Sequence, residues 1–217
     1  TLSTVEAQGY ADAYVRPVAW RGSEMMGVSA QESKIHLSIA VWEWPSYFSP
    51  EARMQGIKLK WAPYKRPSPE CAPVHSKAAG LYMVCTLSKH EAEAEGFDDA
   101  LMLDWRGQLA ETTGANVFLV IDGVIHTPTP DCFLDGITRR SVMSLARKHG
   151  IEIIERAIMP DELSNAEEIF VTGTAAEVTP VGQIADMKFT VGPITKTLLE
   201  DYDRLVREPA DAANPTA

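Results

Sequence analysis

Hydrophobic and polar positions alternate along the first part of the chain with the two-residue period of β-strands. Residues 10–20 and 35–44 are rich in β-prone side chains, and Gly22 and Gly27 mark the turn between them. Residues 57–62 alternate again. The sequence therefore predicts that the chain opens with strands.

Apolar residues recur every three or four positions in three later segments, which is the spacing of amphipathic helices. These segments are 77–95, 137–149 and 194–206; the first is expected to begin near Ser76 and to end at Gly96. The expected buried face of this first helix consists of Leu81, Val84, Cys85, Leu87, Ser88 and Ala92.

Short β-prone runs between the helices predict further strands. They lie at 100–103, 117–121, 124–125, 152–158, 168–172 and 178–181. Asp122-Gly123 is a dipeptide favoured in two-residue hairpin turns, so 117–121 and 124–125 should pair. Strands mixed with helices predict an α/β (α+β) fold.

Prolines and aromatic side chains gather at 44–50, which suits an ordered linker better than a helix or a central strand. We therefore expect the remainder of a small N-terminal domain in 1–44, an interdomain linker in 45–52, a large domain in 53–208 and a frayed tail in 209–217.

Composition limits the classes of function. The chain has 217 residues, 45% of them hydrophobic, and 30 acidic against 20 basic residues give a net charge of −10. Such a charge disfavours nucleic acids and anionic membranes as partners. Cys71, Cys85 and Cys132 show neither metal-ligand spacing nor a disulfide pattern, so no metal site is expected. Without a membrane-spanning run or a signal peptide, we expect a cytoplasmic protein.

Glu111 opens the most informative motif of the chain. It follows the strand-like run 104–110 and precedes the strand 117–121, so we expect it where one strand breaks before the next. A glutamate considered alone is usually a solvated loop residue, because this side chain is seldom fully buried. The motif continues through Asn116 and Phe118 to His126-Thr127.

Together with other blocks in the same order, this motif resembles the class IV pyridoxal-phosphate aminotransferases. The other blocks are Tyr14-Val15-Arg16-Pro17, Ser76-Lys77-Ala78-Ala79-Gly80-Leu81-Tyr82, and Leu134-Asp135-Gly136-Ile137-Thr138-Arg139 with Thr172-Gly173-Thr174-Ala175-Ala176. The chain looks most like a branched-chain amino-acid aminotransferase, and the resemblance extends over about residues 10–202.

The resemblance implies a two-domain enzyme of fold type IV whose large domain binds pyridoxal 5'-phosphate. It also implies transamination of leucine, isoleucine and valine with 2-oxoglutarate, giving branched-chain 2-oxo acids and glutamate in amino-acid biosynthesis. The partners would be these small molecules and a second copy, in a homodimer or a larger homo-oligomer.

Lys77 matches the lysine that the family attaches covalently to the cofactor. A lysine at a helix opening meets partial positive charge, which favours the neutral amine that this bond requires. Ala78, Ala79 and Gly80 leave room for a ring. Glu111 would hold a proton on the pyridine nitrogen, and Tyr82, on the same predicted helix, would reach the cofactor's phenolate oxygen.

Backbone amides at the start of a helix bind anions, so the segment from Gly136 to Thr138 could hold a phosphate. In the resembled family the cofactor residues are Lys77, Tyr82, Glu111, Leu134, Gly136, Ile137, Thr138, Gly173 and Thr174. The substrate residues are Tyr14, Arg16, Trp44, Tyr47, Thr174 and Ala175.

Tyr14 and Arg16 alternate on a predicted strand and should therefore share one face. Aromatic walls suit an apolar substrate side chain, and a guanidinium can receive the distal carboxylate of glutamate through two hydrogen bonds. This pair favours the branched-chain enzymes over (R)-amine transaminases, D-amino-acid transaminases and the aminodeoxychorismate lyases.

A non-catalytic remnant that binds only a small molecule or a partner subunit is the alternative from another class; joint retention of Lys77, Tyr82 and Glu111 disfavours it. Family members also carry a segment before Tyr14 that completes the small domain and adds a phosphate-binding arginine. That arginine has no match in this sequence, so we expect the small domain to be incomplete here.

Overall fold

A computed structural model describes residues 1–44 and 55–207. The chain divides into two compact units, Thr1–Tyr47 and Phe48–Ala217. The predicted linker 45–52 and tail 209–217 lie outside the described residues, as does Tyr47.

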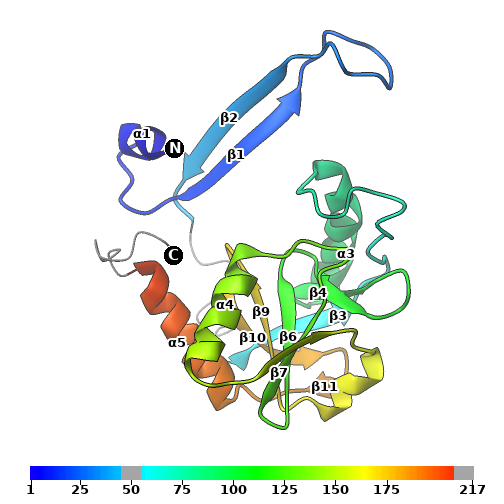
Figure 1. Cartoon of the computed structure of the whole chain (residues 1–217), viewed down its shortest axis with the longest axis vertical. Helices are drawn as coiled ribbons and strands as arrows, with labels where there is room; N and C mark the ends of the chain where they lie inside the picture. The colour runs from blue at the N-terminus through cyan, green and yellow to red at the C-terminus, as the bar shows by residue number, and fades with distance from the viewer. Residues whose placement is uncertain (45–54, 208–217) are drawn as a thin grey trace. The chain divides into compact units, whose positions relative to one another are not determined.

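The first unit is a short helix followed by a β-hairpin (Figure 1). Helix α1 spans Leu2–Ala7, and the antiparallel strands are β1, Tyr14–Arg21, and β2, Ile35–Trp42. Both predicted strands are confirmed, although each is shorter than expected. Helix α1 was not predicted, because it has no buried face and therefore no helical spacing of apolar residues.

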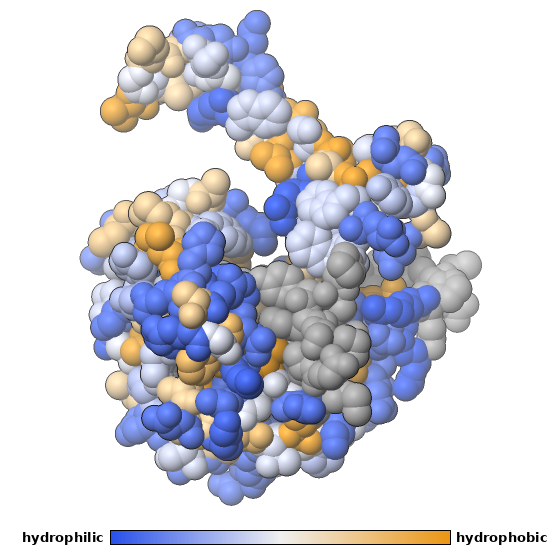
Figure 2. All heavy atoms as spheres, turned by 180° about the vertical axis from the view of Figure 1, so that it is seen from behind, coloured by the Kyte–Doolittle hydropathy of each residue, from blue (hydrophilic) through white to orange (hydrophobic). Residues whose placement is uncertain are grey.

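One face of the hairpin remains apolar and open. Residues directly opposite in an antiparallel pair lie on the same face, so Ala19 and Leu37 share a face with Arg21 and Ile35. Ile35 is 65% and Leu37 67% exposed. Hydrophobic side chains accordingly show along the hairpin surface in Figure 2.

The second unit is built around a sheet that closes on itself. Its strands are β3 Ile57–Trp61, β4 Asp99–Leu103, β5 Leu109–Thr112, β6 Asn116–Ile121, β7 Val124–Pro128, β8 Ile153–Arg156, β9 Glu168–Gly173, β10 Glu177–Ile184 and β11 Met187–Lys188. In the described residues they run in the order β11-β10-β3-β4-β5-β6-β7-β8, and β9 pairs with both β10 and β6. Strands β10, β3, β4, β5, β6 and β9 therefore form a closed ring.

Helices flank this ring. They are the 3-10 helix η1, Ala79–Tyr82, then α3, Met83–Ala94, α4, Ile137–Lys148, the 3-10 helix η2, Pro160–Asn165, and α5, Pro193–Arg207. Helices α4 and α5 contact each other and both contact β9. Mixed strands and helices confirm the predicted α/β class. None of the described helices combines the length and hydropathy that crossing a membrane requires.

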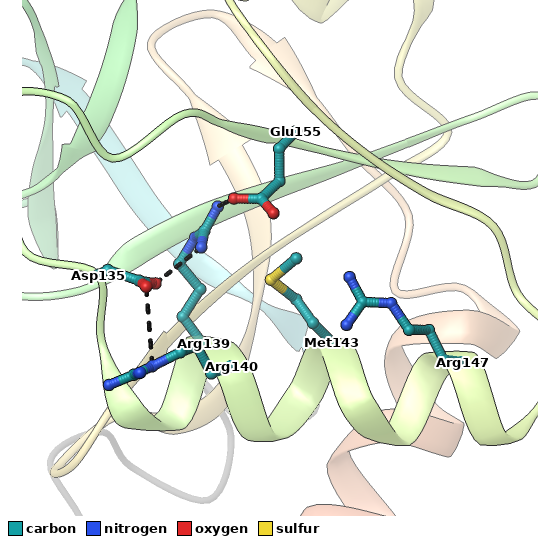
Figure 3. Close-up of a pocket in the computed structure, with 6 residues that line it drawn as sticks. All are labelled: Asp135, Arg139, Arg140, Met143, Arg147 and Glu155. Carbon is teal, nitrogen blue, oxygen red and sulfur yellow. Dashed lines mark hydrogen bonds and ion pairs between the residues drawn. The ribbon is translucent and has the colours of Figure 1, made fainter.

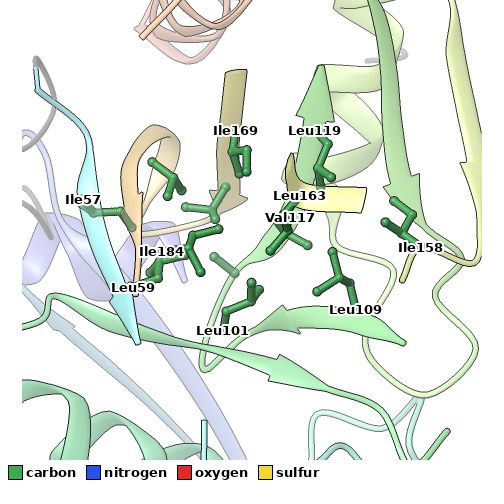
Figure 4. Packing of buried hydrophobic residues seen from close by; sticks show 13 residues of the cluster. Ile57, Leu59, Leu101, Leu109, Val117, Leu119, Ile158, Leu163, Ile169 and Ile184 are labelled. Carbon is green, nitrogen blue, oxygen red and sulfur yellow. The ribbon is translucent and has the colours of Figure 1, made fainter. Parts of the chain in front are cut away.

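Burial of β6 on both faces explains why its residues 117–121 are all apolar. Val117 and Leu119 point into the core enclosed by the ring (Figure 4), whereas Phe118 and Val120 point into a second core beneath α4 and α5. A strand buried on both faces needs no polar alternation. The predicted turn after it is also confirmed, since Asp122 and Gly123 both have positive φ, 52° and 75°.

A buried carboxylate fixes the start of α5. Glu168 on β9 accepts hydrogen bonds from the backbone N–H groups of Ile194 and Thr195, at 3.2 and 2.7 Å. A Cβ on Gly192 would overlap this carboxylate, so the approach requires glycine. Glu168 thus satisfies donors that the helix itself leaves unpaired.

Candidate functional site

Lys77 lies in a loop rather than at the opening of a helix. The 3-10 helix η1 begins just after it at Ala79, and α3 begins only at Met83, so the predicted start near Ser76 is wrong. Ala78 is extended, with φ −90° and ψ 134°, which keeps the chain out of the helical region. The ammonium is 5.7 Å from the centre of the Tyr82 ring. Loop backbone, and not a shared helix, therefore brings these two residues together.

The start of α3 also changes which residues it buries. Cys85, Ser88 and Ala92 form its buried face. Leu87 is 45% exposed, so its predicted place in the core is wrong. The phase of a helix that buries these three residues turns Leu87 toward the surface.

Glu111 lies within β5, not in a break between strands. The break falls at 113–115, where the N–H of Thr112 bonds the carbonyl of Ala115 and returns the chain into β6. Glu111 consequently pairs with Asn116 across the two strands. The predicted position of Glu111 at the strand break is wrong, because β5 continues through Thr112 before this tight turn.

Glu111 is a buried acid with long, weak contacts. The Nδ2 atom of Asn116 lies 3.4 Å from its Oε2, and the Nε atom of Arg66 lies 3.4 Å from its Oε1. Burial raises the pKa of Glu111 to about 8, although the charges of Arg66 and Lys77 pull it down. The negative charge of Asp99 raises the pKa of Glu111 slightly. Among the described residues, no shorter hydrogen bond reaches this carboxyl group.

Arg66, which contacts Glu111, was not predicted from the sequence. Its Nη1 atom donates to the carbonyl of Leu81 at 3.4 Å and lies 3.3 Å from the Sγ of Cys85. Its Nε is buried and has no hydrogen bond. The only local signal is Pro67 after it, which marks a non-helical segment but not a partner for an acid.

Asn116 ties Glu111 to the loop before α4. Its Nδ2 atom donates to the carbonyl of Leu134 at 3.0 Å, and its Oδ1 would lie only 2.5 Å from a Cβ at Gly136. Gly136 is the N-cap of α4, and no side chain caps the helix there. The first backbone N–H groups of α4 therefore remain available to an anion.

The residues beyond Gly136 differ in exposure. Ile137 is exposed, whereas Thr138 is buried with its hydroxyl oxygen 3.4 Å from that of Tyr202. Leu134 is half-buried. Ile137 therefore offers a backbone donor at the surface of this loop. The buried Thr138 side chain holds the loop to Tyr202.

The turn between β9 and β10 lies beside Asn116. Thr172 on β9 pairs with Asn116, and a Cβ on Gly173 would lie 3.3 Å from the carbonyl of Gly114. Thr174 and Ala175 follow in the turn itself. Thus β5, β6 and β9 bring Glu111, Asn116 and this small-residue turn to one end of the ring.

In the first unit, Tyr14 and Arg16 share a face, as the strand period predicts. The guanidinium carbon of Arg16 lies 5.2 Å from the centre of the Tyr14 ring, and Trp44 lies 5.0 Å from that ring, centre to centre. Tyr47, the remaining predicted substrate residue, lies outside the described residues.

A cavity of about 250 Å³ on α4 involves none of the predicted cofactor or substrate residues (Figure 3). Arg139, 1% exposed, forms ion pairs there with Asp135 at 2.8 Å and Glu155 at 2.7 Å. Arg140 and Arg147 complete its charged lining. The ion pair with Glu155 anchors α4 to β8, and we assign the cavity no part in the predicted chemistry.

Asp104, Asp131 and Cys132 place three ligand-type atoms within 4.8 Å of one another. The cation that these carboxylates hold is Arg106, whose Nη2 lies 2.7 Å from both. Burial, with help from Asp131, raises the pKa of Cys132 to about 12, so a thiolate is disfavoured. This cluster is an ion-pair network.

Comparison with known proteins identifies the family to which this sequence is similar. The family model described as "Amino-transferase class IV" matches residues 1–184. The "Branched-chain-amino-acid aminotransferase" of Pseudomonas aeruginosa is 39% identical over 215 residues, which cover 98% of this chain and 70% of that protein.

Two solved structures are similar as well. A branched-chain aminotransferase from Thermoproteus uzoniensis, solved with norvaline, has a TM-score of 0.89 and 35% identity, and the match covers 94% of this chain and 68% of that one. A branched-chain amino acid aminotransferase from T.th., solved with pyridoxamine 5'-phosphate, has a TM-score of 0.90 and 38% identity, covering 95% and 70%. The chain thus spans about 70% of the length of these relatives.

Proposed function

The chain belongs to the class IV aminotransferase family, and we propose that it transaminates branched-chain L-amino acids with 2-oxoglutarate. Pyridoxal 5'-phosphate is the cofactor, and branched-chain 2-oxo acids and L-glutamate are the products. The similar proteins named above are branched-chain enzymes, and two thirds or more of their length is matched.

The state of Glu111 is the observation that carries this proposal. It is a buried acid with a pKa raised to about 8, and its nearest donors are 3.4 Å away. A protonated heteroaromatic nitrogen would supply the strong, charged donor that this carboxyl group lacks. Glu111 would then be ionised and would hold a proton on that nitrogen.

The surrounding residues fit the rest of the cofactor. A Cβ at Gly136 would lie 2.5 Å from the Oδ1 of Asn116 and one at Gly173 would lie 3.3 Å from the carbonyl of Gly114, so small residues keep both turns packed close to this end of the ring. The uncapped start of α4, at Gly136, Ile137 and Thr138, suits a phosphate, with Thr174 as a further donor. Leu134 would pack on the ring, and Tyr82 would bond its phenolate oxygen.

Pyridoxal phosphate, when bound, withdraws electrons from the α-carbon of an attached amino acid. Lys77 is the residue that anchors it covalently, and the side chain is exposed in a loop that can present the amine. Once released, the Nζ atom of Lys77 accepts the proton that leaves the substrate α-carbon. Glu111 keeps the ring nitrogen protonated throughout.

Residues of the first unit would recognise the substrate. Tyr14, Trp44 and Tyr47 offer aromatic surface to an apolar side chain, and Arg16 receives the distal carboxylate of glutamate or 2-oxoglutarate. The Thr174-Ala175 backbone would hold the α-carboxylate. Residues 1–44 accordingly belong to the small domain, 45–52 to the linker and 53–208 to the cofactor-binding domain.

We further propose a cytoplasmic homodimer or larger homo-oligomer. Cys71, Cys85 and Cys132 are all free thiols, as in a reducing compartment. Ile35 and Leu37 expose apolar surface on the hairpin, which a second subunit would cover. Size measurement on the purified protein tests this assembly.

An absorbance experiment tests the function. The purified protein with pyridoxal phosphate should acquire a visible band that L-leucine bleaches and that D-leucine leaves unchanged. Borohydride treatment followed by peptide mass analysis should find the cofactor on Lys77. Lys77→Ala should show neither the band nor the adduct. A band that responds to D-leucine alone would point instead to a D-amino-acid transaminase.

A further inference from the structure

Trp42 belongs to an aromatic cluster on one face of the hairpin. Its ring centre is 5.1 Å from that of Tyr14 and 5.7 Å from that of Trp44. The guanidinium carbon of Arg16 lies 5.3 Å from the Trp42 ring centre, nearly the same as its distance from Tyr14. Arg16 therefore lies against two rings, one from each strand.

The strand register explains this arrangement. Tyr14 is directly opposite Trp42, and Arg16 is directly opposite Ala40, so all four side chains share a face. Because Ala40 is small, the long Arg16 side chain can cross toward the diagonal neighbour Trp42. The two rings then set the direction in which the guanidinium points.

Attraction to aromatic rings leaves the hydrogen-bonding capacity of arginine intact. A guanidinium held over a ring can still direct N–H donors in its own plane toward a carboxylate. In the part of the chain that the structure describes, no acid forms an ion pair with Arg16. Within residues 1–44 and 55–207, aromatic rings rather than a carboxylate therefore position its charge.

We propose that Trp42 is the positioning residue for Arg16 and thereby sets how well the enzyme accepts five-carbon dicarboxylate substrates. The inference rests on the proposed function, in which Arg16 receives the distal carboxylate. Because Trp42 acts through Arg16, removal of the Trp42 ring selectively weakens the binding of dicarboxylate substrates. A branched-chain substrate has no second carboxylate and does not use the guanidinium.

The test compares two non-reacting ligands on the full-length holoenzyme: glutarate, which carries the second carboxylate, and 4-methylpentanoate, which does not. Trp42→Leu should raise the dissociation constant of glutarate about fivefold, the range of a lost cation–π contact. The dissociation constant of 4-methylpentanoate should rise less than twofold. Steady-state rates should show the same split, as a higher KM for 2-oxoglutarate with a similar kcat.

Matched variants separate positioning from general damage. Trp20 stacks on His36 on the same face, with ring centres 5.5 Å apart, but does not contact Arg16 in the described interactions. Trp20→Leu should therefore change neither dissociation constant. Trp42→Phe keeps a smaller ring and should restore most of the glutarate affinity, and it provides the test if Trp42→Leu fails to fold.

Equal weakening of both ligands, or of neither, would overturn the role of Trp42. An unsubstituted enzyme that transaminates L-leucine yet binds glutarate no better than Arg16→Leu would refute the inference while leaving the transaminase function standing. An unsubstituted enzyme that neither attaches the cofactor to Lys77 nor responds to L-leucine would refute the proposed function, and the inference with it.

Discussion

The Nε atom of Arg66 lies 3.4 Å from the Oε1 atom of Glu111, and only 5% and 12% of their side chains are exposed. The positive charge of Arg66 gives partial compensation for the cost of burying an ionised Glu111, since Coulomb attraction is stronger away from water. Compensation is incomplete, because burial still raises the pKa of Glu111 to about 8. Arg66 therefore sets how readily Glu111 ionises when a ligand offers it a proton donor.

Replacement of Arg66 by leucine should weaken cofactor binding. Without the guanidinium, the pKa of Glu111 rises further and the neutral carboxyl is a poorer partner for a protonated ring nitrogen. One further pKa unit corresponds to about a tenfold loss of affinity. Titration of the protein with pyridoxal phosphate, followed by absorbance between pH 6 and 9, measures the loss.

Arg66→Lys is the control for this substitution, because it keeps the charge while removing the bonds to Leu81 and Cys85. It should retain more affinity than Arg66→Leu. Equal affinity of Arg66→Leu and the unsubstituted protein across this pH range would show that Glu111 does not depend on Arg66.

Glu111→Gln should remove a pH dependence from the stability of the cofactor-free protein. The pKa of Glu111 is raised from its ordinary 4.5 to about 8 in the folded state. The raised pKa therefore contributes fully to the stability of the fold below pH 4.5. This stabilisation is lost as the pH rises from 4.5 through about 8. The loss amounts to at most about 5 kcal/mol.

Denaturant unfolding at pH 5, 7 and 8.5 tests this expectation. The stability of the unsubstituted protein should fall across the series more steeply than that of Glu111→Gln, which has no charge to bury. Identical slopes for the two proteins would mean that Glu111 ionises freely in the folded state.

Local patterns in the sequence predicted much of the fold. The dipeptide Asp122-Gly123 placed a hairpin turn, and Gly136 placed the start of α4, because both signals act within a few residues. The start of α3 was misplaced, since apolar spacing continues back through the loop of Lys77 while the extended Ala78 excludes a helix. Short-range spacing cannot detect that change in backbone.

The candidate site depended on longer-range relationships. Family resemblance selected Lys77, Tyr82 and Glu111, but nothing local linked them to Arg66, which is 45 residues before Glu111 and reaches it only through the folded sheet. Trp42 was likewise overlooked, because its importance follows from its register opposite Tyr14. Strand pairing, which no single segment encodes, creates both relationships.

Gly136→Ala should disturb the loop that would hold the phosphate. An added Cβ would lie 2.5 Å from the Oδ1 of Asn116, closer than such atoms can approach. Displacement of Asn116 or the loop should cost about 1 to 3 kcal/mol of stability and lower cofactor affinity. Thermal unfolding and cofactor titration measure the two effects.

Gly114→Ala is the matched control, since a Cβ at Gly114 would meet no atom within 4 Å. It should leave thermal unfolding nearly unchanged. A Gly136→Ala protein as stable as Gly114→Ala, with the same cofactor affinity, would indicate that the loop adjusts freely.

Asn116→Asp should impair the site in two ways, by adding a charge and by removing a hydrogen-bond donor. The Nδ2 atom of Asn116 lies 3.4 Å from Glu111 and also donates to the carbonyl of Leu134 at 3.0 Å. Aspartate has a similar size, but it brings a second carboxylate beside the first and removes the donor to Leu134. Like charges at this distance raise the pKa of the pair, so one of the two acids remains protonated near neutral pH.

Cofactor affinity of Asn116→Asp should therefore fall about tenfold or more at pH 7.5 and recover partly at higher pH, where both acids ionise. Asn116→Ala separates the two effects, since it loses the bond to Leu134 without adding charge. It should bind the cofactor less tightly than the unsubstituted protein, but with an unshifted pH profile. If the two variants share one pH profile, the added charge has no influence on Glu111, and Asn116 acts only by holding the loop at Leu134.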